Sequence, residues 1–205
     1  MGRVTPMFPL GTVLFPHAVL PLHVFEPRYR ALTRAVLDGD QEFGVVLIER
    51  GSEVGGGDVR FDVGTVAHIV QASELADGRF ALSVVGVSRF RVEQWLPDDP
   101  YPRAEIVEID DANDVAGSVA LVDPVVAALR EVYELYGRVH DVATSVPLEL
   151  SPDPEQASYE VAALAALGPL DAQRVLELPD TETRLRVLLE VLVDHAALLR
   201  SQLGR

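Results

Sequence analysis

MFPLGTVLFP at residues 7–16 and LPLHVFEPRYR at residues 20–30 are the two stretches from which the architecture of this chain is best inferred. Both are apolar and both are interrupted by Pro, which has no backbone N–H to donate to a sheet. Each stretch is therefore expected to pair with neighbouring strands along no more than one edge.

The first helix is predicted to begin directly after the second stretch. In Glu26-Pro27 the Pro takes the first helical position, where its missing N–H costs nothing. The apolar spacing then predicts a helix over residues 27–37. The side chains expected to face the core are Tyr29, Leu32, Ala35 and Val36.

The rest of the chain changes character near residue 115. Before this point, short β-branched or alternating runs are separated by turn signals such as Asp77-Gly78, which favours a barrel or a sandwich. Gly64 is expected to mark a bulge or bend. The predicted strands cover residues 43–49, 59–69, 80–84, 88–95 and 101–109.

After this point the apolar period becomes 3.6 residues. The predicted helices cover residues 119–140, with Pro124 near the true start, 155–167, 171–178 and 180 onward. The last helix carries an apolar stripe, which is expected either to pack within a four-helix unit or to bind a partner. The predicted division is a β-rich subdomain at 1–115 and a helical subdomain at 116–205. The acidic run 110–114 lacks the Gly and Glu of a calcium loop and is predicted to be a solvated connector.

Composition excludes several classes of function. A net charge of −15 over 205 residues disfavours binding to nucleic acid and to anionic membranes. The absence of Cys excludes disulfides and thiolate catalysis. All 17 basic residues are Arg, so the chain has no phosphate-loop Lys, no Schiff base and no Ser–Lys dyad. No signal peptide or apolar membrane span is apparent, which predicts a cytoplasmic protein.

Catalytic and metal motifs are also missing. The five His residues include no pair at the i, i+4 spacing of a zinc helix, and no Ser lies in a GxSxG elbow. The run Gly55-Gly56-Gly57 lacks the Lys of a phosphate loop and is interpreted as a flexible turn. No catalytic residue, cofactor or metal is predicted, and no pattern assigns an oligomeric state.

A recognition surface is predicted around the Pro-rich loop and the start of the first helix. Pro residues hold the backbone shape, so docking there costs little conformational entropy. Aromatic and Arg side chains supply most interface hot spots, although Phe25 and Tyr29 would equally suit a core. Glu26 and Arg28 are open to a second interpretation, as a helix cap and a surface ion pair. The candidate protein-binding residues are Pro16, His23, Phe25, Glu26, Arg28 and Tyr29.

Five motifs, in order along nearly the whole chain, resemble the amino-terminal, substrate-binding domain of Lon proteases (peptidase family S16). One departure is His17, because the family usually has Gly after this Phe-Pro; if φ is positive there, His is strained. The motifs are the opening string, Gly64-Thr65-Val66-Ala67-His68-Ile69, Val84-Val85-Gly86-Val87-Ser88-Arg89-Phe90-Arg91-Val92, Tyr101-Pro102-Arg103-Ala104-Glu105-Ile106, and Gln173-Arg174-Val175-Leu176-Glu177 with Arg184-Leu185.

The resemblance implies an α+β fold, a PUA-like β-barrel with one inserted helix, followed by a C-terminal helical bundle. In full-length Lon this domain precedes an ATPase module and a Ser–Lys protease module. Neither is recognised here, so the chain is expected to be a stand-alone, non-enzymatic domain. It would bind client polypeptides or a partner in the proteolysis machinery. The alternative is a small-ligand-binding domain or cryptic enzyme that uses a groove between barrel and helices.

Overall fold

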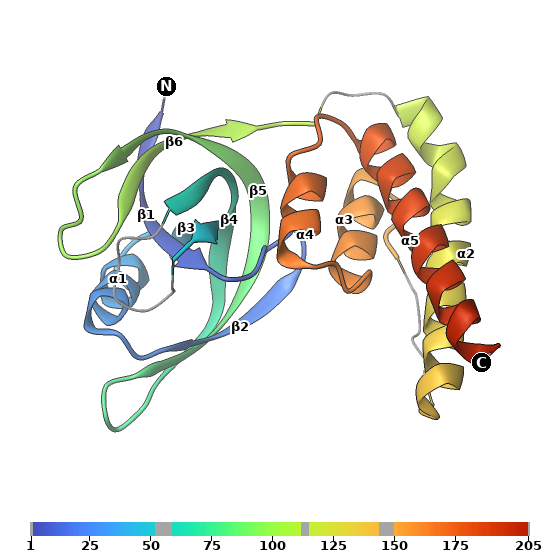
Figure 1. Cartoon of the computed structure of the whole chain (residues 1–205). Coiled ribbons are helices and arrows are strands. Elements are labelled where there is room, and N and C mark those ends of the chain that lie inside the picture. The colour runs from blue at the N-terminus through green and yellow to red at the C-terminus, as the bar shows by residue number, and fades with distance from the viewer. Residues whose placement is uncertain (1, 52–58, 112–114, 144–149, 205) are drawn as a thin grey trace. The chain divides into compact units, whose positions relative to one another are not determined.

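The structure, a computed structural model, describes residues 2–51, 59–111, 115–143 and 150–204. Its mixed α+β fold has six strands and five helices in these ranges (Figure 1). The chain forms two compact units. The first contains the residues up to Asp110 together with Pro169–Leu176, and the second contains Asp111–Gly168 and Glu177–Arg205.

All six strands belong to one sheet in the first unit. Their pairing order is β2-β5-β4-β3-β1-β6, and β5 also pairs with β6, so β5, β4, β3, β1 and β6 form a closed cycle of five strands. β2 stands outside this closed cycle and pairs with β5. The strands are β1 (Arg3–Leu10), β2 (Val19–Val24), β3 (Glu42–Arg50), β4 (Val59–Glu74), β5 (Phe80–Leu96) and β6 (Arg103–Ile109).

The Pro residues of β1 explain how this strand changes partner. Its residues 3–6 pair antiparallel with β6, and its residues 7–10 pair parallel with β3. In these registers no residue of β1 pairs with both neighbouring strands at once. The missing N–H groups of Pro6 and Pro9 therefore do not interrupt pairing on two sides of the same residue. The prediction of pairing along no more than one edge is confirmed for β2, whereas β1 as a whole pairs with two strands, with β6 through residues 3–6 and with β3 through residues 7–10.

Helix α1 (Pro27–Leu37) begins with Pro at its first turn, as predicted, and covers one end of the core. Its buried side chains are those of Tyr29, Leu32, Thr33 and Val36. The expectation for Ala35 was wrong: it is exposed, because the i, i+3, i+4, i+7 stripe that starts at Tyr29 passes through Thr33 instead. The buried Thr33 hydroxyl donates to the Tyr29 carbonyl at 2.9 Å.

The long hairpin of β4 and β5 turns at the predicted Asp77-Gly78 pair, where Gly78 has φ of 77°. The backbone N–H of Arg79 donates to the Asp77 carboxylate and lowers the pKa of that group. Two predicted strands, 80–84 and 88–95, are in fact the single strand β5, because Gly86 stays within the ladder. The irregularity expected near Gly64 is a register shift in the β3–β4 pairing between Gly64 and Arg60.

The second unit contains α2 (Val115–His140), α3 (Pro154–Leu164) and α5 (Thr181–Leu203). Pro124 was predicted near the start of α2 but lies inside this helix, where its ring is exposed. The predicted stripe of α5 is buried at Leu185, Leu188, Leu192 and Ala196, which confirms the core-packing interpretation of that face.

Helix α4 (Pro169–Leu176) belongs to the first unit, although the sequence groups it with the helices of residues 116–205. Gln173 Nε2 donates to the Val63 carbonyl at 3.0 Å, and Arg89 Nη1 donates to the Leu176 carbonyl at 2.8 Å. These two buried bonds join residues far apart in the sequence, which is why periodicity did not reveal them. Among the described helices, none is sufficiently long and apolar to cross a membrane.

Candidate functional site

A pocket of about 140 Å³ lies in the first unit, where β2 ends and α1 begins. β1 contributes Phe8 and Leu10, β2 contributes its last four residues, the connection to α1 contributes Phe25 and Glu26, and α1 contributes Tyr29. The full lining is Phe8, Leu10, Pro21, Leu22, His23, Val24, Phe25, Glu26 and Tyr29. We call this the β2–α1 pocket.

The two aromatic residues predicted for the site have different environments. Tyr29 is 3% exposed and stacks on Phe8 with ring centroids 4.1 Å apart, so it belongs to the core while also lining the pocket. Phe25 is 51% exposed. An exposed Phe beside an apolar pocket offers a contact surface that the fold itself leaves largely in solvent.

The charged residues of the site neutralise each other. Arg28 Nε lies 3.2 Å from Glu26 Oε2, and the two side chains are only 17% and 15% exposed. The Arg28 guanidinium also lies 4.5 Å from the centroid of the Tyr29 ring. Glu26 occupies the N-cap position of α1 but makes no side-chain capping bond, so its partner is Arg28. The pocket therefore has an apolar lining and a paired rather than a free charge at its rim.

The structure gathers five of the six predicted site residues and leaves Pro16 out. His23, Phe25, Glu26 and Tyr29 line the pocket, and Arg28 pairs with one of them. Pro16 is buried in a separate turn.

That turn contains the His residue at which the chain departs from the Lon motif. His17 has φ of 64°, so the positive φ considered from the sequence is present. Its N–H donates to the Gly86 carbonyl at 2.8 Å. A Cβ at Gly86 would lie 2.2 Å from the Phe15 carbonyl oxygen, so this loop closes directly on a glycine of β5.

Sequence reasoning did not name most of the apolar half of the pocket, namely Phe8, Leu10, Leu22 and Val24. The signal for part of it was present, because Leu20, Leu22 and Val24 alternate with more exposed residues along β2. The contribution of β1 had no local signal, since it depends on how the sheet curls.

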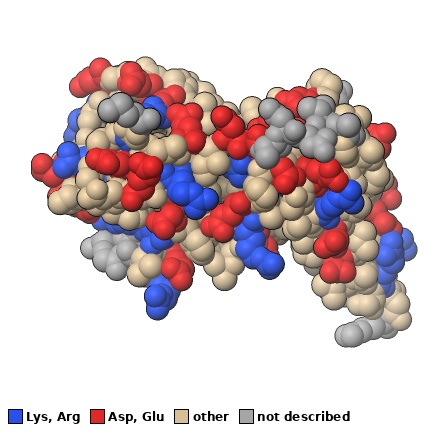
Figure 2. All heavy atoms as spheres, turned by 90° about the horizontal axis from the view of Figure 1, so that it is seen from above, with Lys and Arg blue, Asp and Glu red and all other residues tan. Residues whose placement is uncertain are grey.

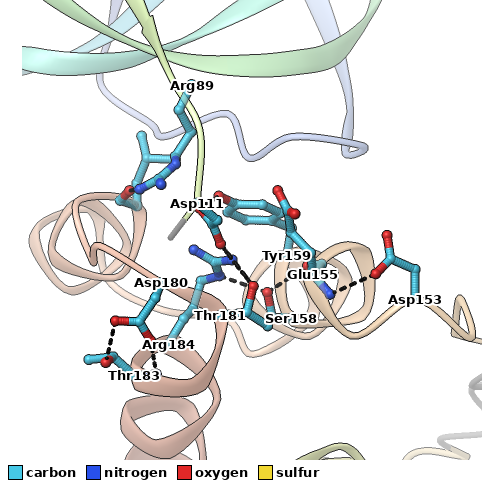
Figure 3. A network of polar contacts seen from close by, with 11 residues as sticks. Arg89, Asp111, Asp153, Glu155, Ser158, Tyr159, Asp180, Thr181, Thr183 and Arg184 are labelled. Carbon is cyan, nitrogen blue, oxygen red and sulfur yellow. Dashed lines mark hydrogen bonds and ion pairs between the residues drawn. The ribbon is translucent and has the colours of Figure 1, made fainter. Parts of the chain in front are cut away.

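A buried polar network in the second unit was also missed (Figure 3). Arg184 is fully buried; its Nη2 pairs with Asp111 Oδ2, and its Nε donates to Ser158 Oγ at 2.7 Å. Asp111 also accepts from Thr181 Oγ1 at 2.9 Å and from the Tyr159 hydroxyl at 3.2 Å. The prediction of a solvated connector at residues 110–114 is therefore wrong for Asp111, whose charge is compensated in the interior. Residues 112–114 of that run lie outside the described part of the chain.

The other motifs considered for catalysis or metal binding add no second candidate site among the described residues. Gly55-Gly56-Gly57 lies outside the described residues. In the described ranges, no three His, Asp or Glu side chains come together in a way that would hold a metal ion. Acidic and Arg side chains are interspersed over the face seen in Figure 2, with an overall acidic excess.

Comparisons with known proteins bear on the family and the fold of the chain. Residues 4–194 match the family model of the ATP-dependent protease La (LON) substrate-binding domain. "Lon protease 2" of Myxococcus xanthus is 32% identical over 195 residues, which cover 93% of this chain but 23% of that relative. The chain thus spans about a quarter of the length of the curated relatives it matches.

Two solved structures have the same fold. The crystal structure of a Lon N-terminal domain protein from Xanthomonas campestris is 26% identical, with a TM-score of 0.66 over 92% of this chain and 98% of that one. The N-terminal domain of a Mycobacterium avium complex Lon protease gives a TM-score of 0.64 at 21% identity, over 94% of this chain and 100% of that one. The match to the family model extends over most of the chain, and on this ground the chain belongs to the Lon substrate-binding domain family.

Proposed function

We propose that this chain is a non-catalytic protein-binding module that engages exposed apolar segments of client polypeptides at the β2–α1 pocket. Membership of the Lon substrate-binding domain family supports the class of function. The observation that carries the assignment to this surface is Phe25, which is 51% exposed beside a pocket with an apolar lining. We further propose that the closed cycle of five strands is a PUA-like barrel and that the partner proteins belong to the proteolysis machinery.

The size of the pocket favours a peptide side chain over a small free ligand. Pockets for drug-sized ligands usually enclose about 300–1,000 Å³. The β2–α1 pocket, at about 140 Å³, is well below that range. The carboxylate at its rim is already paired with Arg28, so it offers no free charge to orient a polar ligand.

Binding through the pocket alone would be weak. Burying one apolar side chain contributes about 1.5–3 kcal/mol, whereas micromolar affinity requires about 8 kcal/mol. Client segments must therefore contact a longer surface than the pocket, or they must exchange rapidly.

The test is capture of unfolded casein by immobilised protein, with melting temperature measured in parallel. Phe25→Ala and His23→Ala should lower capture without lowering the melting temperature, because both residues are exposed. The matched control is Val70→Ala, an equally exposed apolar residue on β4 in the same unit, 58% accessible. The casein released should be intact, and added ATP should not be hydrolysed. Capture by both site variants at the parental level would remove this surface from consideration.

A further inference from the structure

β2 has an edge next to the β2–α1 pocket with which none of the described strands pairs. In the described part of the chain it lies at the end of the strand order, with β5 as its one neighbour, and Val19 to Val24 pair with Val85 to Phe80. A strand at the edge of a sheet presents unpaired N–H and C=O groups, which form a template for another extended chain.

The register shows which groups are free. Gly86 N–H donates to the Ala18 carbonyl at 2.9 Å, and alternate residues of an antiparallel strand direct their backbone groups to the same side. Residues 20, 22 and 24 therefore point their backbone groups toward β5. The N–H groups of Val19 and His23 point away from it, as do the carbonyls of residues 19, 21 and 23. Pro21 fits this direction, because a Pro in a sheet is tolerated where its nitrogen faces no partner strand.

The side chains of β2 define the pattern that an added strand would follow. Val24 is buried and Leu20 and Leu22 are partly buried against the core, whereas Val19 is 66% exposed. A strand added beside β2 would have the same alternation, with every second side chain on the core side. The pocket is lined by residues 21–24 of β2 and by Phe8 and Leu10 of β1. One core-side side chain of the added strand would therefore reach the pocket.

We propose that a client segment binds in an extended conformation as an additional strand on the free edge of β2, with one apolar side chain in the β2–α1 pocket. This inference rests on the proposed function and specifies its mode. Backbone hydrogen bonds supply affinity that does not depend on client sequence, and the pocket selects segments with apolar side chains at alternate positions. Pro21 leaves only two amide donors along the edge, which limits affinity and favours release.

The experiment uses a short fluorescently labelled peptide in which Val and Thr alternate, and two derivatives. One derivative carries N-methyl groups on every Val and the other on every Thr, so the side chains are kept while one set of N–H donors is removed. Anisotropy titrations with the whole chain give the three affinities. Only one set of donors faces β2 in a paired strand, so one derivative should bind at least about tenfold more weakly, while the other binds like the parent peptide. Loss with methylated Thr indicates antiparallel addition, and loss with methylated Val indicates parallel addition.

Each other result overturns the strand-addition mode. If both derivatives bind like the parent peptide, the backbone makes no contribution and the side chains alone dock. If both lose affinity equally, or if the parent peptide does not bind, an added strand is refuted. In all three cases the casein capture assay with Phe25→Ala still decides the proposed function by itself. As a check on location, Phe25→Ala should weaken the parent peptide and Val70→Ala should leave it unchanged.

Discussion

Replacement of Asp111 by Asn tests whether the buried network holds the second unit together. The change keeps the shape of the side chain and removes its charge, which leaves the fully buried Arg184 guanidinium without its counter-ion. Arg184 Nη1 already has no hydrogen-bond partner among the described residues, and its Cζ lies 3.8 Å from the centroid of the Tyr159 ring. Removing one member of a buried ion pair typically costs about 3–5 kcal/mol, a large part of the stability of a small domain.

A second set of variants removes the Arg184 charge alone and then both charges together. Arg184→Met alone should also be costly, because it leaves Asp111 ionised in the interior without its buried counter-ion, although the Thr181 and Tyr159 hydroxyls still donate to it. The double variant Asp111→Asn/Arg184→Met should cost less than the sum of the single changes, since neither charge is then left unpaired. The matched control is Arg186→Met, whose pair with Glu182 is exposed and should be worth less than about 1 kcal/mol.

The assay is urea unfolding followed by far-ultraviolet circular dichroism, in which α2, α3 and α5 give most of the helical signal. Because the chain has two units, hydrogen exchange of the α5 amides reports on the second unit separately. The reasoning is refuted if Asp111→Asn costs no more than Arg186→Met, or if the single costs add in the double variant.

Two further predictions concern the loop that closes on β5. His17 has φ of 64°, so the His17→Gly variant should be more stable than the His17→Ala variant by about 1 kcal/mol. This order is the reverse of that at ordinary exposed positions, and thermal melts of the two variants test it. Gly86→Ala should destabilise the first unit by about 1–3 kcal/mol, because the new Cβ would lie 2.2 Å from the Phe15 carbonyl oxygen. An unchanged midpoint in urea for Gly86→Ala would show that the loop moves aside freely.

The sequence by itself determined the local structure of this protein. Pro6, Pro9 and Pro21 limit pairing because a missing N–H acts wherever the residue is placed. Pro27 starts α1, the apolar stripe of α5 is buried, and Asp77-Gly78 makes the hairpin turn. These features follow from steric limits and periodicities that extend over a few residues. The prediction that His23, Phe25 and Glu26 belong to a binding site rests on the same limits, because Pro21 and Pro27 restrict the backbone on either side of them.

Only the tertiary structure decided the features that join distant residues. The pocket needs Phe8 and Leu10 from β1 opposite the end of β2, and α4 joins the first unit through Arg89 and Gln173. Asp111 is buried because Arg184, far away in the sequence, supplies a compensating charge. A buried charge or a pocket wall is favourable only when its partner is in place. The free energy of these contacts therefore belongs to pairs of segments that the chain brings together, and no single segment of the sequence carries it.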